Sequence, residues 1–289
     1  EELDVHETIH QVRKRCKKLR GLVRLVRPHM EKVYQEENAA YRDCSKNLSR
    51  FRDAQALIES FDELLQHFPP AVKVEDLSQL RRELVTRQEK MITENSEVKD
   101  RLDVFLDMMR QGRERIDAWP LKKEDFDLLE KGLVKTYRRG RKAMKQAYEQ
   151  LTVVAFHEWR KRVKYHWYHA RLLQNVWPGL FAKYGEELKR LSDYLGDGHD
   201  LAILRQTLQG NPEQYGSREM LQAFIGLVER RQTELHLRAR PLGGRIYVEK
   251  PTNHGKRLRG YWKAWQLQQT LRPKVGSLED AGDGWNPND

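Results

Sequence analysis

The sequence has few cysteines that could cross-link a small fold and no long apolar run that could span a membrane. Its 289 residues include two cysteines, Cys16 and Cys44, which are too few for a disulfide framework and are predicted to be buried as small apolar side chains. No apolar run approaches the roughly 18 residues of a membrane span, and the opening segment EELDVHETIH has neither the basic nor the apolar region of a signal peptide. These absences predict a cytoplasmic protein without a membrane association.

Sequence motifs of the common enzyme classes are also missing. The chain has no Walker loop, no dinucleotide-binding glycine fingerprint, no His-Glu-x-x-His motif and no Gly-x-Ser-x-Gly turn. His6 with His10, and His166 with His169, could chelate a metal, but neither pair brings the further ligands that a zinc site needs. We therefore expect a protein that is not an enzyme and that holds no metal or other cofactor.

The 18 glycines and 10 prolines are clustered, and they divide the chain into long segments. Within these segments apolar residues recur at spacings of three and four, the period of an amphipathic helix. Only residues 244–249 could form a strand, which alone would be marginal. The tail, 273–289, is rich in Gly, Asp, Asn and Pro and is predicted to be disordered. We predict an all-α fold with helices near 5–27, 30–67, 77–118, 124–150, 152–176, 180–209, 217–239 and 252–270.

Positive charge is abundant and is gathered into four short segments. The chain carries 54 Lys and Arg against 43 Asp and Glu, a formal net charge of +11. Segments 9–28, 131–148, 156–171 and 250–263 together carry +24, so the remainder of the chain is acidic. Like charges repel at helical i,i+4 spacing, and three of the four segments contain no acid to offset this repulsion. The distribution favours a polyanionic partner over a merely basic, solvated surface.

An internal repeat relates two of these segments. The pattern His-x-x-Arg-Lys-Arg-x-Lys begins at His10 and occurs again 147 residues later, at His157. The same offset, without a gap, pairs Asp53 with Asp200. One offset that holds over such a length is hard to obtain by chance, so the chain is predicted to be a duplicated four-helix unit. Its two halves would cover residues 5–150 and 152–271.

On the first helix of each copy, apolar and basic residues fall on separate faces at 100° per residue. The apolar faces are predicted to be core and comprise Ile9, Val12, Cys16, Leu19, Val23 and Val26, then Phe156, Trp159, Val163, His166, Ala170 and Leu173. The basic faces are predicted to contact the polyanion and comprise His10, Arg13, Lys14, Lys17, Arg20 and Arg24, then His157, Arg160, Lys161, Lys164 and Arg171. The other two basic segments add Arg138, Arg141, Lys142, Lys145, Lys256 and Arg259.

The histidines and one acidic cluster leave several interpretations open. His10 and His157 could donate hydrogen bonds to an anion, fix the geometry of the basic face, or be structural; no carboxylate in their own turns of that face supports acid–base catalysis. The segment Asp197-Gly198-His199-Asp200 resembles a ligand-binding loop. Because the first copy keeps only its last residue, we interpret Asp53 and Asp200 as structural, pairing with an arginine of a neighbouring helix or capping a turn.

These motifs resemble those of the CHAD family, the conserved histidine α-helical domain. The resemblance runs from about Val5 to about Leu271 in the family's order. It rests on the two His-x-x-Arg-Lys motifs and on Phe51-Arg52-Asp53-Ala54, Tyr137-Arg138-Arg139-Gly140-Arg141, Leu195-Gly196-Asp197-x-x-Asp200-Leu201 and Tyr261-Trp262-x-x-Trp265. It implies that residues 1–289 form one domain of two four-helix bundles, related by a pseudo-twofold axis, with a basic central pore between them.

The resemblance further implies that the chain binds inorganic polyphosphate without turning it over. It implies that the ligand-facing residues are His10, Arg13, Lys14, Lys17, His157, Arg160, Lys161 and Lys164, with Arg138, Arg141, Lys142, Lys256 and Arg259 adding to them. Successive helical turns present a cation about every 5 Å, which suits a flexible polyanion with one charge per unit. Such a ligand is compatible with association with polyphosphate granules. Nucleic acid is the alternative ligand, less favoured because the basic faces hold few aromatic residues for base stacking.

Overall fold

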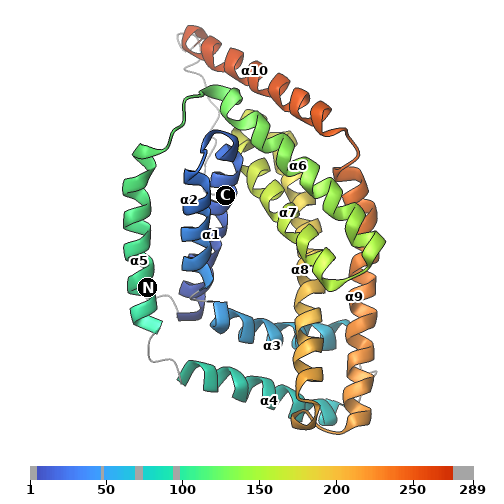
Figure 1. The fold of residues 1–289 in the computed structure, drawn as a ribbon. Coiled ribbons are helices and arrows are strands. Elements are labelled where there is room, and N and C mark those ends of the chain that lie inside the picture. Colours follow the sequence, from blue (N-terminus) through green and yellow to red (C-terminus); the bar gives the residue numbers. More distant parts are fainter. Residues whose placement is uncertain (1–4, 47–48, 69–73, 94–97, 276–289) are drawn as a thin grey trace.

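The computed structural model describes residues 5–46, 49–68, 74–93 and 98–275, and helices account for nearly all of them (Figure 1). No strand occurs within these ranges, so the all-α prediction is confirmed. Nor does any helix there have the length and apolarity to cross a membrane. The helices are α1 (Val5–Val26), α2 (Val33–Lys46), α3 (Ser49–His67), α4 (Val74–Thr93), α5 (Val98–Arg115), α6 (Asp125–Gln150), α7 (Val153–Leu172), α8 (Pro178–Gly210), α9 (Arg218–Ile246) and α10 (Pro251–Val275), with short 3-10 helices η1 (Arg27–His29), η2 (Ile116–Ala118), η3 (Gln174–Val176) and η4 (Pro212–Gln214).

Two of the predicted helices are each replaced by a pair of helices that run in different directions (Figure 1). The predicted segment 30–67 contains α2 and α3, and the predicted segment 77–118 contains α4 and α5. Packing explains the difference. Helix α2 lies against α1 and α5, whereas α3 and α4 share a core with α8 and α9. One straight helix cannot reach both places.

Helix α9 continues beyond its predicted end at residue 239, through Pro241 to Ile246. Proline usually ends a helix because it lacks the N–H donor and crowds the preceding turn. Here Leu242 and Ile246 are buried in the core, and this packing outweighs the local cost. The possible strand at 244–249 is therefore wrong, because its first three residues close the helix. Helix α10 ends at Val275, and the rest of the predicted disordered tail lies outside the described residues.

Two large apolar clusters hold the helices together. One joins α6, α7 and α10 with the adjoining ends of α8 and α9, around Tyr137 and Trp159. The other joins α3 and α4 with the opposite ends of α8 and α9. In it the rings of Phe61 and Phe224 lie 5.2 Å apart between centroids. Helices of both predicted halves therefore contribute to this second cluster.

The apolar faces predicted for α1 and α7 are confirmed as core. On α7, all six residues of the face are buried, including His166. On α1, Ile9, Cys16, Val23 and Val26 are buried, and Val12 and Leu19 are half-buried. The prediction for the cysteines also holds, because Cys16 and Cys44 are both buried free thiols that pack with Phe105.

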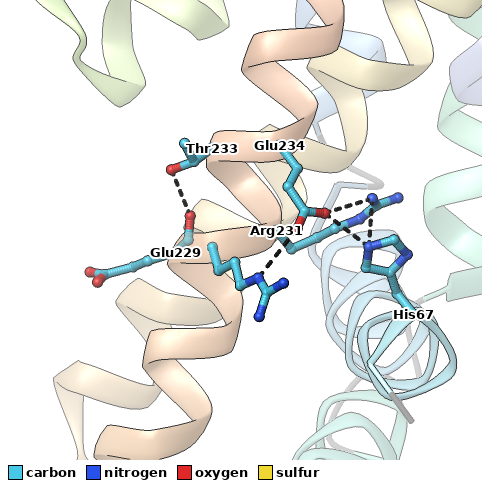
Figure 2. Close-up of polar contacts among 6 residues, drawn as sticks. His67, Glu229, Arg231, Thr233 and Glu234 are labelled. Carbon is cyan, nitrogen blue, oxygen red and sulfur yellow. Dashed lines mark hydrogen bonds and ion pairs between the residues drawn. The ribbon is translucent and has the colours of Figure 1, made fainter. Parts of the chain in front are cut away.

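A polar contact ties the end of α3 to α9 beside the second cluster (Figure 2). The Nε2 atom of His67 lies 2.9 Å from Glu234 Oε2 and 3.1 Å from Arg231 Nη1. Arg231 also donates to Glu234 over 3.4 Å, which closes a three-membered arrangement. This contact joins segments that are more than 160 residues apart in the sequence, and so adds to the link between the two predicted halves.

Helix α6 crosses α1 at a glycine. A Cβ atom built on Gly132 would lie 1.7 Å from the carbonyl oxygen of Leu25, a distance that no side chain can occupy. The crossing therefore requires glycine at this position. It brings the cationic residues of α6 next to the last turn of α1 and the first turn of η1.

Candidate polyanion-binding site

Helices α1 and α7, the first helices of the two repeat copies, pack against each other. The side chain of Tyr168 lies over Gly21, where an added Cβ would be 3.1 Å from the tyrosine ring. The buried ring of His169 donates a hydrogen bond from Nε2 to the carbonyl oxygen of Gly21 over 2.9 Å. Burial lowers the pKa of His169 to about 4, so this donor is neutral at pH 7. The contact brings the two predicted basic faces together.

The start of α7 is fixed by a helix cap. The hydroxyl of Thr152 accepts a hydrogen bond from the backbone N–H of Ala155 over 3.2 Å. This satisfies one of the donors that a helix leaves unpaired at its first turn. The cap sets where the helix begins, and the apolar face seated in the core sets its rotation. Together they determine which way His157 and Arg160 point.

Four of the predicted residues converge where α1 and α7 meet: Arg13 and Lys17 from α1, and Arg160 and Lys164 from α7. We call them the central cluster. The pKa of Lys17 is lowered to about 8, mainly by burial and then by the charges of Arg13 and Arg160. Burial and Arg160 likewise lower the pKa of Lys164. Yet the side chain of Lys17 is accessible to solvent. The charge of Lys17 is therefore both crowded by neighbouring cations and within reach of a dissolved anion.

Carboxylates on α8 offset part of this charge. The charge of Asp200 partly offsets the lowering of the pKa of Lys17 and of Lys164, and that of Asp193 does the same for Lys164. Asp200 thus lies near lysines of two neighbouring helices. Its repeat counterpart, Asp53, has a side chain outside the described residues. Arg160 has a buried Nε atom without a hydrogen-bond partner among the described residues.

His157 lies beside His199 of α8, with ring centroids 4.2 Å apart. Burial, followed by neighbouring positive charge, lowers the pKa of each to about 4, so both rings are neutral at pH 7. The segment 197–200, which resembled a loop, is part of helix α8. Two of its residues have different surroundings: His199 lies beside His157, and Asp197 does not. Asp197 lines a different hollow with Glu63, and burial together with the charge of Glu63 raises the pKa of Asp197 to about 6.

The central cluster is not free of protein contacts, since Arg13 donates to the carbonyl oxygen of Ser45 over 3.2 Å. The other predicted residues of α1 and α7 lie outside it. Arg20 and Arg24 both donate to Oδ1 of Asn38, over 3.4 and 3.1 Å. Lys161 forms an ion pair with Glu158. Arg171 is exposed and lies over the ring of Trp167, 5.3 Å from its centroid. The remaining two, both half-buried on α1, are His10 and Lys14.

The predicted residues of α6 and α10 do not join the central cluster. Arg259 of α10 is held by two carboxylates of α6, donating to Asp127 over 2.7 Å and contacting Glu130. These contacts raise the pKa of Arg259 and neutralise its charge locally. The five others are exposed on the surfaces of α6 and α10: Arg138, Arg141, Lys142, Lys145 and Lys256.

The histidine pair that could chelate a metal on α7 is divided between two partners. His166 Nε2 lies 3.1 Å from the hydroxyl of Tyr184, whereas His169 contacts Gly21. No group of three or more His, Cys, Asp or Glu in the described part of the chain is arranged to hold a metal ion.

Sequence reasoning left out His199 and three half-buried cations: Lys135, Arg139 and Arg162. The three cations were inside the basic segments, so their charge was visible. Arg139 and Arg162 lie off the exposed stripes, which places them toward a neighbouring helix, whereas Lys135 shares its helical stripe with the exposed Lys131 and Arg138 and carried no such signal. His199 was noticed only as part of a loop-like motif.

A family model described as CHAD domain matches residues 1–209. The match covers helices α1 to α7 and nearly all of α8, and so includes both His-x-x-Arg-Lys motifs and the whole central cluster. The resemblance noted for the last helix, with Lys256 and Arg259, lies outside it. A comparison with curated proteins and one with solved structures returned no match.

Proposed function

Because the chain belongs to the CHAD family, which is associated with polyphosphate-related proteins, we propose that it is a non-catalytic module that binds inorganic polyphosphate. The ligand would lie along the basic faces of α1 and α7 and pass over the central cluster. Such binding also predicts association with polyphosphate granules in the cytoplasm.

The observation that supports this proposal most is the convergence of four cations from two helices that are 147 residues apart. Without a ligand, the charges of Arg13, Arg160 and Lys164 add to burial, the larger cause, in lowering the pKa of Lys17. A polyanion removes that repulsion and gains charge-assisted hydrogen bonds. Because polyphosphate carries one negative charge per unit, a single chain can engage several of these cations in succession, whereas orthophosphate cannot.

We also infer that the two copies are related by a pseudo-twofold axis near the contact of α1 and α7, with the central cluster lining a basic pore between two bundles. A residue close to a twofold axis lies near its own counterpart. Lys17 and Lys164 are counterparts in the repeat, and Lys164 is close enough to lower the pKa of Lys17. Superposition of the two halves in an experimental structure tests this symmetry.

Nucleic acid is the second candidate ligand, since the same charge would attract it. Its binding without sequence preference normally uses aromatic faces on which bases stack. The aromatic rings beside the basic faces are covered by the protein's own cations. Arg24 lies over Tyr165 at 4.4 Å, and Lys164 over Trp167 at 5.1 Å. This arrangement favours a ligand without bases.

The non-catalytic part of the proposal rests on the histidine of the second copy. A general acid or base works best when its pKa is near the working pH. The pKa of His157 is about 4, so at pH 7 it is a weak base and is not in the imidazolium form that acts as a general acid. Incubation of long-chain polyphosphate with the protein and Mg²⁺ tests this directly. We expect chain length to remain unchanged, and measurable shortening would show an enzyme.

The experiment for the binding proposal is a titration with long-chain polyphosphate at two salt concentrations, with single-stranded DNA and orthophosphate as competitors. We expect tight, salt-sensitive binding that neither competitor displaces at comparable phosphate concentration. Equal displacement by DNA would make the protein a general polyanion binder. Absence of binding at low salt would reject polyphosphate as the ligand.

A further inference from the structure

A second group of cations surrounds a small hollow near the C-terminal end of α1, where its last turn and η1 meet α6 and α7. Five of the seven residues that line the hollow are cationic, and all five are half-buried. They come from four elements that the packing of α6 on α1 and α7 brings together. We call this group the α6 hollow; its cations are Arg24, Arg27, Lys135, Arg139 and Arg162.

The cations of the α6 hollow are held in place mainly by neutral groups. Arg24 lies over the ring of Tyr165 at 4.4 Å, and Arg27 over the ring of Tyr34 at 4.4 Å. None of the residues that line the hollow is acidic. The carboxylate of Glu158 contacts Arg162 from outside the lining, over 3.0 Å. Aromatic and amide contacts orient an arginine without cancelling its charge, so the hollow keeps a strong positive potential.

The cations of the α6 hollow also destabilise one another's charged forms. Burial, then Arg162 and Arg27, lower the pKa of Arg139. Burial, then Arg27, lower the pKa of Lys135. In addition, the Nε atom of Arg24 is buried without a hydrogen-bond partner in the described part of the chain. A buried donor without a partner carries a desolvation cost, which an anion in the hollow would remove.

We propose that the α6 hollow is a separate binding site for a compact phosphate ligand of the pyrophosphate class. The hollow has room for about one water-sized group, so a ligand would place a phosphate oxygen in it and its remaining charge at the mouth. The donors approach from several elements, which suits a group with two or more charges on few atoms. A long chain instead needs an open groove. The guanidinium groups of Arg139 and Arg162 can each donate two hydrogen bonds to phosphate oxygens, and Thr136 adds a neutral hydroxyl to the lining.

Two sources could supply this ligand. One is a free diphosphate, and the other is the terminal unit of a long polyphosphate chain. The second source rests on the proposed function, because it requires that the chain be bound by this protein. The first does not.

The test is a calorimetric titration with inorganic pyrophosphate. Lys135→Gln removes one cation from the hollow. Its matched control, Lys131→Gln, removes the same charge one turn earlier on α6, from an exposed lysine outside the lining. We expect pyrophosphate to bind about tenfold more weakly to Lys135→Gln, the loss typical of one charge-assisted hydrogen bond, and unchanged to Lys131→Gln. Absence of binding to the wild-type protein, or equal binding to both variants, would overturn the proposal.

Thermal unfolding of Arg139→Gln gives a second, independent measurement. Because the substitution relieves like-charge repulsion, the variant is expected to melt at the same or a higher temperature than the wild type in low salt. Pyrophosphate should then raise the melting temperature of the wild type more than that of the variant. Equal shifts would contradict the proposal. So would pyrophosphate binding that Arg160→Glu abolishes and Arg139→Gln leaves intact, since that places the ligand at the central cluster.

Long-chain polyphosphate distinguishes the two sources. If saturating pyrophosphate weakens the binding of the long chain, the chain end occupies the hollow; if it leaves that binding unchanged, the hollow takes a free diphosphate. Both results support the site. The proposed function fails on different measurements, namely the long-chain titration and its dependence on Arg13 and Arg160.

Discussion

The two copies of the basic motif share their residue pattern but differ in what surrounds the charges. In the first copy, on α1, the residue after the histidine is Gln11, whose amide donates to Glu7 over 2.5 Å. In the second copy, on α7, the same position is Glu158. It contacts Lys161 and Arg162 of its own helix. One substitution between the copies therefore changes how much positive charge each copy offers to a ligand.

The direction of the pKa shift of Glu158 shows that its carboxylate interacts strongly with neighbouring cations. Burial raises its pKa, but the contacts with Lys161 and Arg162 outweigh burial and lower the pKa overall. The carboxylate therefore stays charged at neutral pH and neutralises part of the second copy. Repeat identity alone thus does not measure the charge that is available for binding, because one acid within a helical turn competes with the ligand for the cations.

The largest expected effect follows from reversing charge in both copies at once. In the double variant Arg13→Glu with Arg160→Glu, affinity for long-chain polyphosphate should fall by about 100-fold or more, because each lost charge-assisted hydrogen bond costs about 1.5–3 kcal/mol. Helix content should stay unchanged by circular dichroism. The matched control reverses two exposed arginines of α9, Arg218 and Arg245, and should bind nearly as the wild type does. If both double variants lost affinity equally, the loss would be due to the change in net charge and not to the central cluster.

A reciprocal exchange sharpens the comparison between the copies. Glu158→Gln makes the second copy like the first and frees Lys161 and Arg162, so affinity should rise by about three- to tenfold. The salt dependence should steepen by about 0.7 in the log–log slope for each recovered contact. Gln11→Glu makes the opposite change in the first copy and should weaken binding by a similar factor. Titration at several salt concentrations measures both; changes of the same sign in the two variants would contradict the interpretation.

The pH dependence of binding tests the crowding at Lys17. Its pKa is lowered to about 8 in the folded protein, so the side chain is charged below that pH and neutral above it. Affinity for polyphosphate should therefore fall by about threefold or more between pH 7 and pH 9. Lys17→Arg keeps the charge across this range and should remove the pH step, whereas Lys14→Arg should retain it. If affinity still fell between pH 7 and pH 9 in Lys17→Arg, the titrating group would be one other than Lys17.

The smallest effect is expected on stability in acid. The pKa of His157 and that of His199 are about 4 in the folded protein, against an ordinary value of 6.5 in the unfolded chain. Between these values the unfolded chain binds more protons, so stability is complete above pH 6.5 and declines as the pH falls toward 4. His199→Gln should flatten this decline, with a difference of about 2–4 °C in melting temperature at pH 5. An unchanged acid slope would contradict it.

Much of the fold was predictable because it depends on local periodicity. The spacing of apolar residues located five of the eight predicted helices to within five residues at each end, and it identified the buried faces of α1 and α7. The failures occurred where packing overrode a local rule. Pro241 did not end α9, since Leu242 and Ile246 are buried beyond it. The helices predicted for 30–67 and 77–118 each became two, because their ends pack in different places.

The candidate site was predictable in its charge but only partly in its membership. The repeat identified Arg13, Lys17, Arg160 and Lys164, and the structure brings these four together. The sequence could not show that Arg259 is neutralised, because the carboxylates that contact it lie on α6, about 130 residues away in the chain.

By itself, the sequence determined the helical segments, their apolar faces and the concentration of positive charge, since each depends on residues within a few turns of one another. It also determined the repeat, because that needs only a comparison of the chain with itself. Only the tertiary structure decided which cations face each other and which meet a carboxylate. The energy between two charges depends on their separation in space and on their exposure to water. Arg27 and Arg139 are 112 residues apart in the chain, yet they line one hollow because Gly132 lets α6 cross α1 closely.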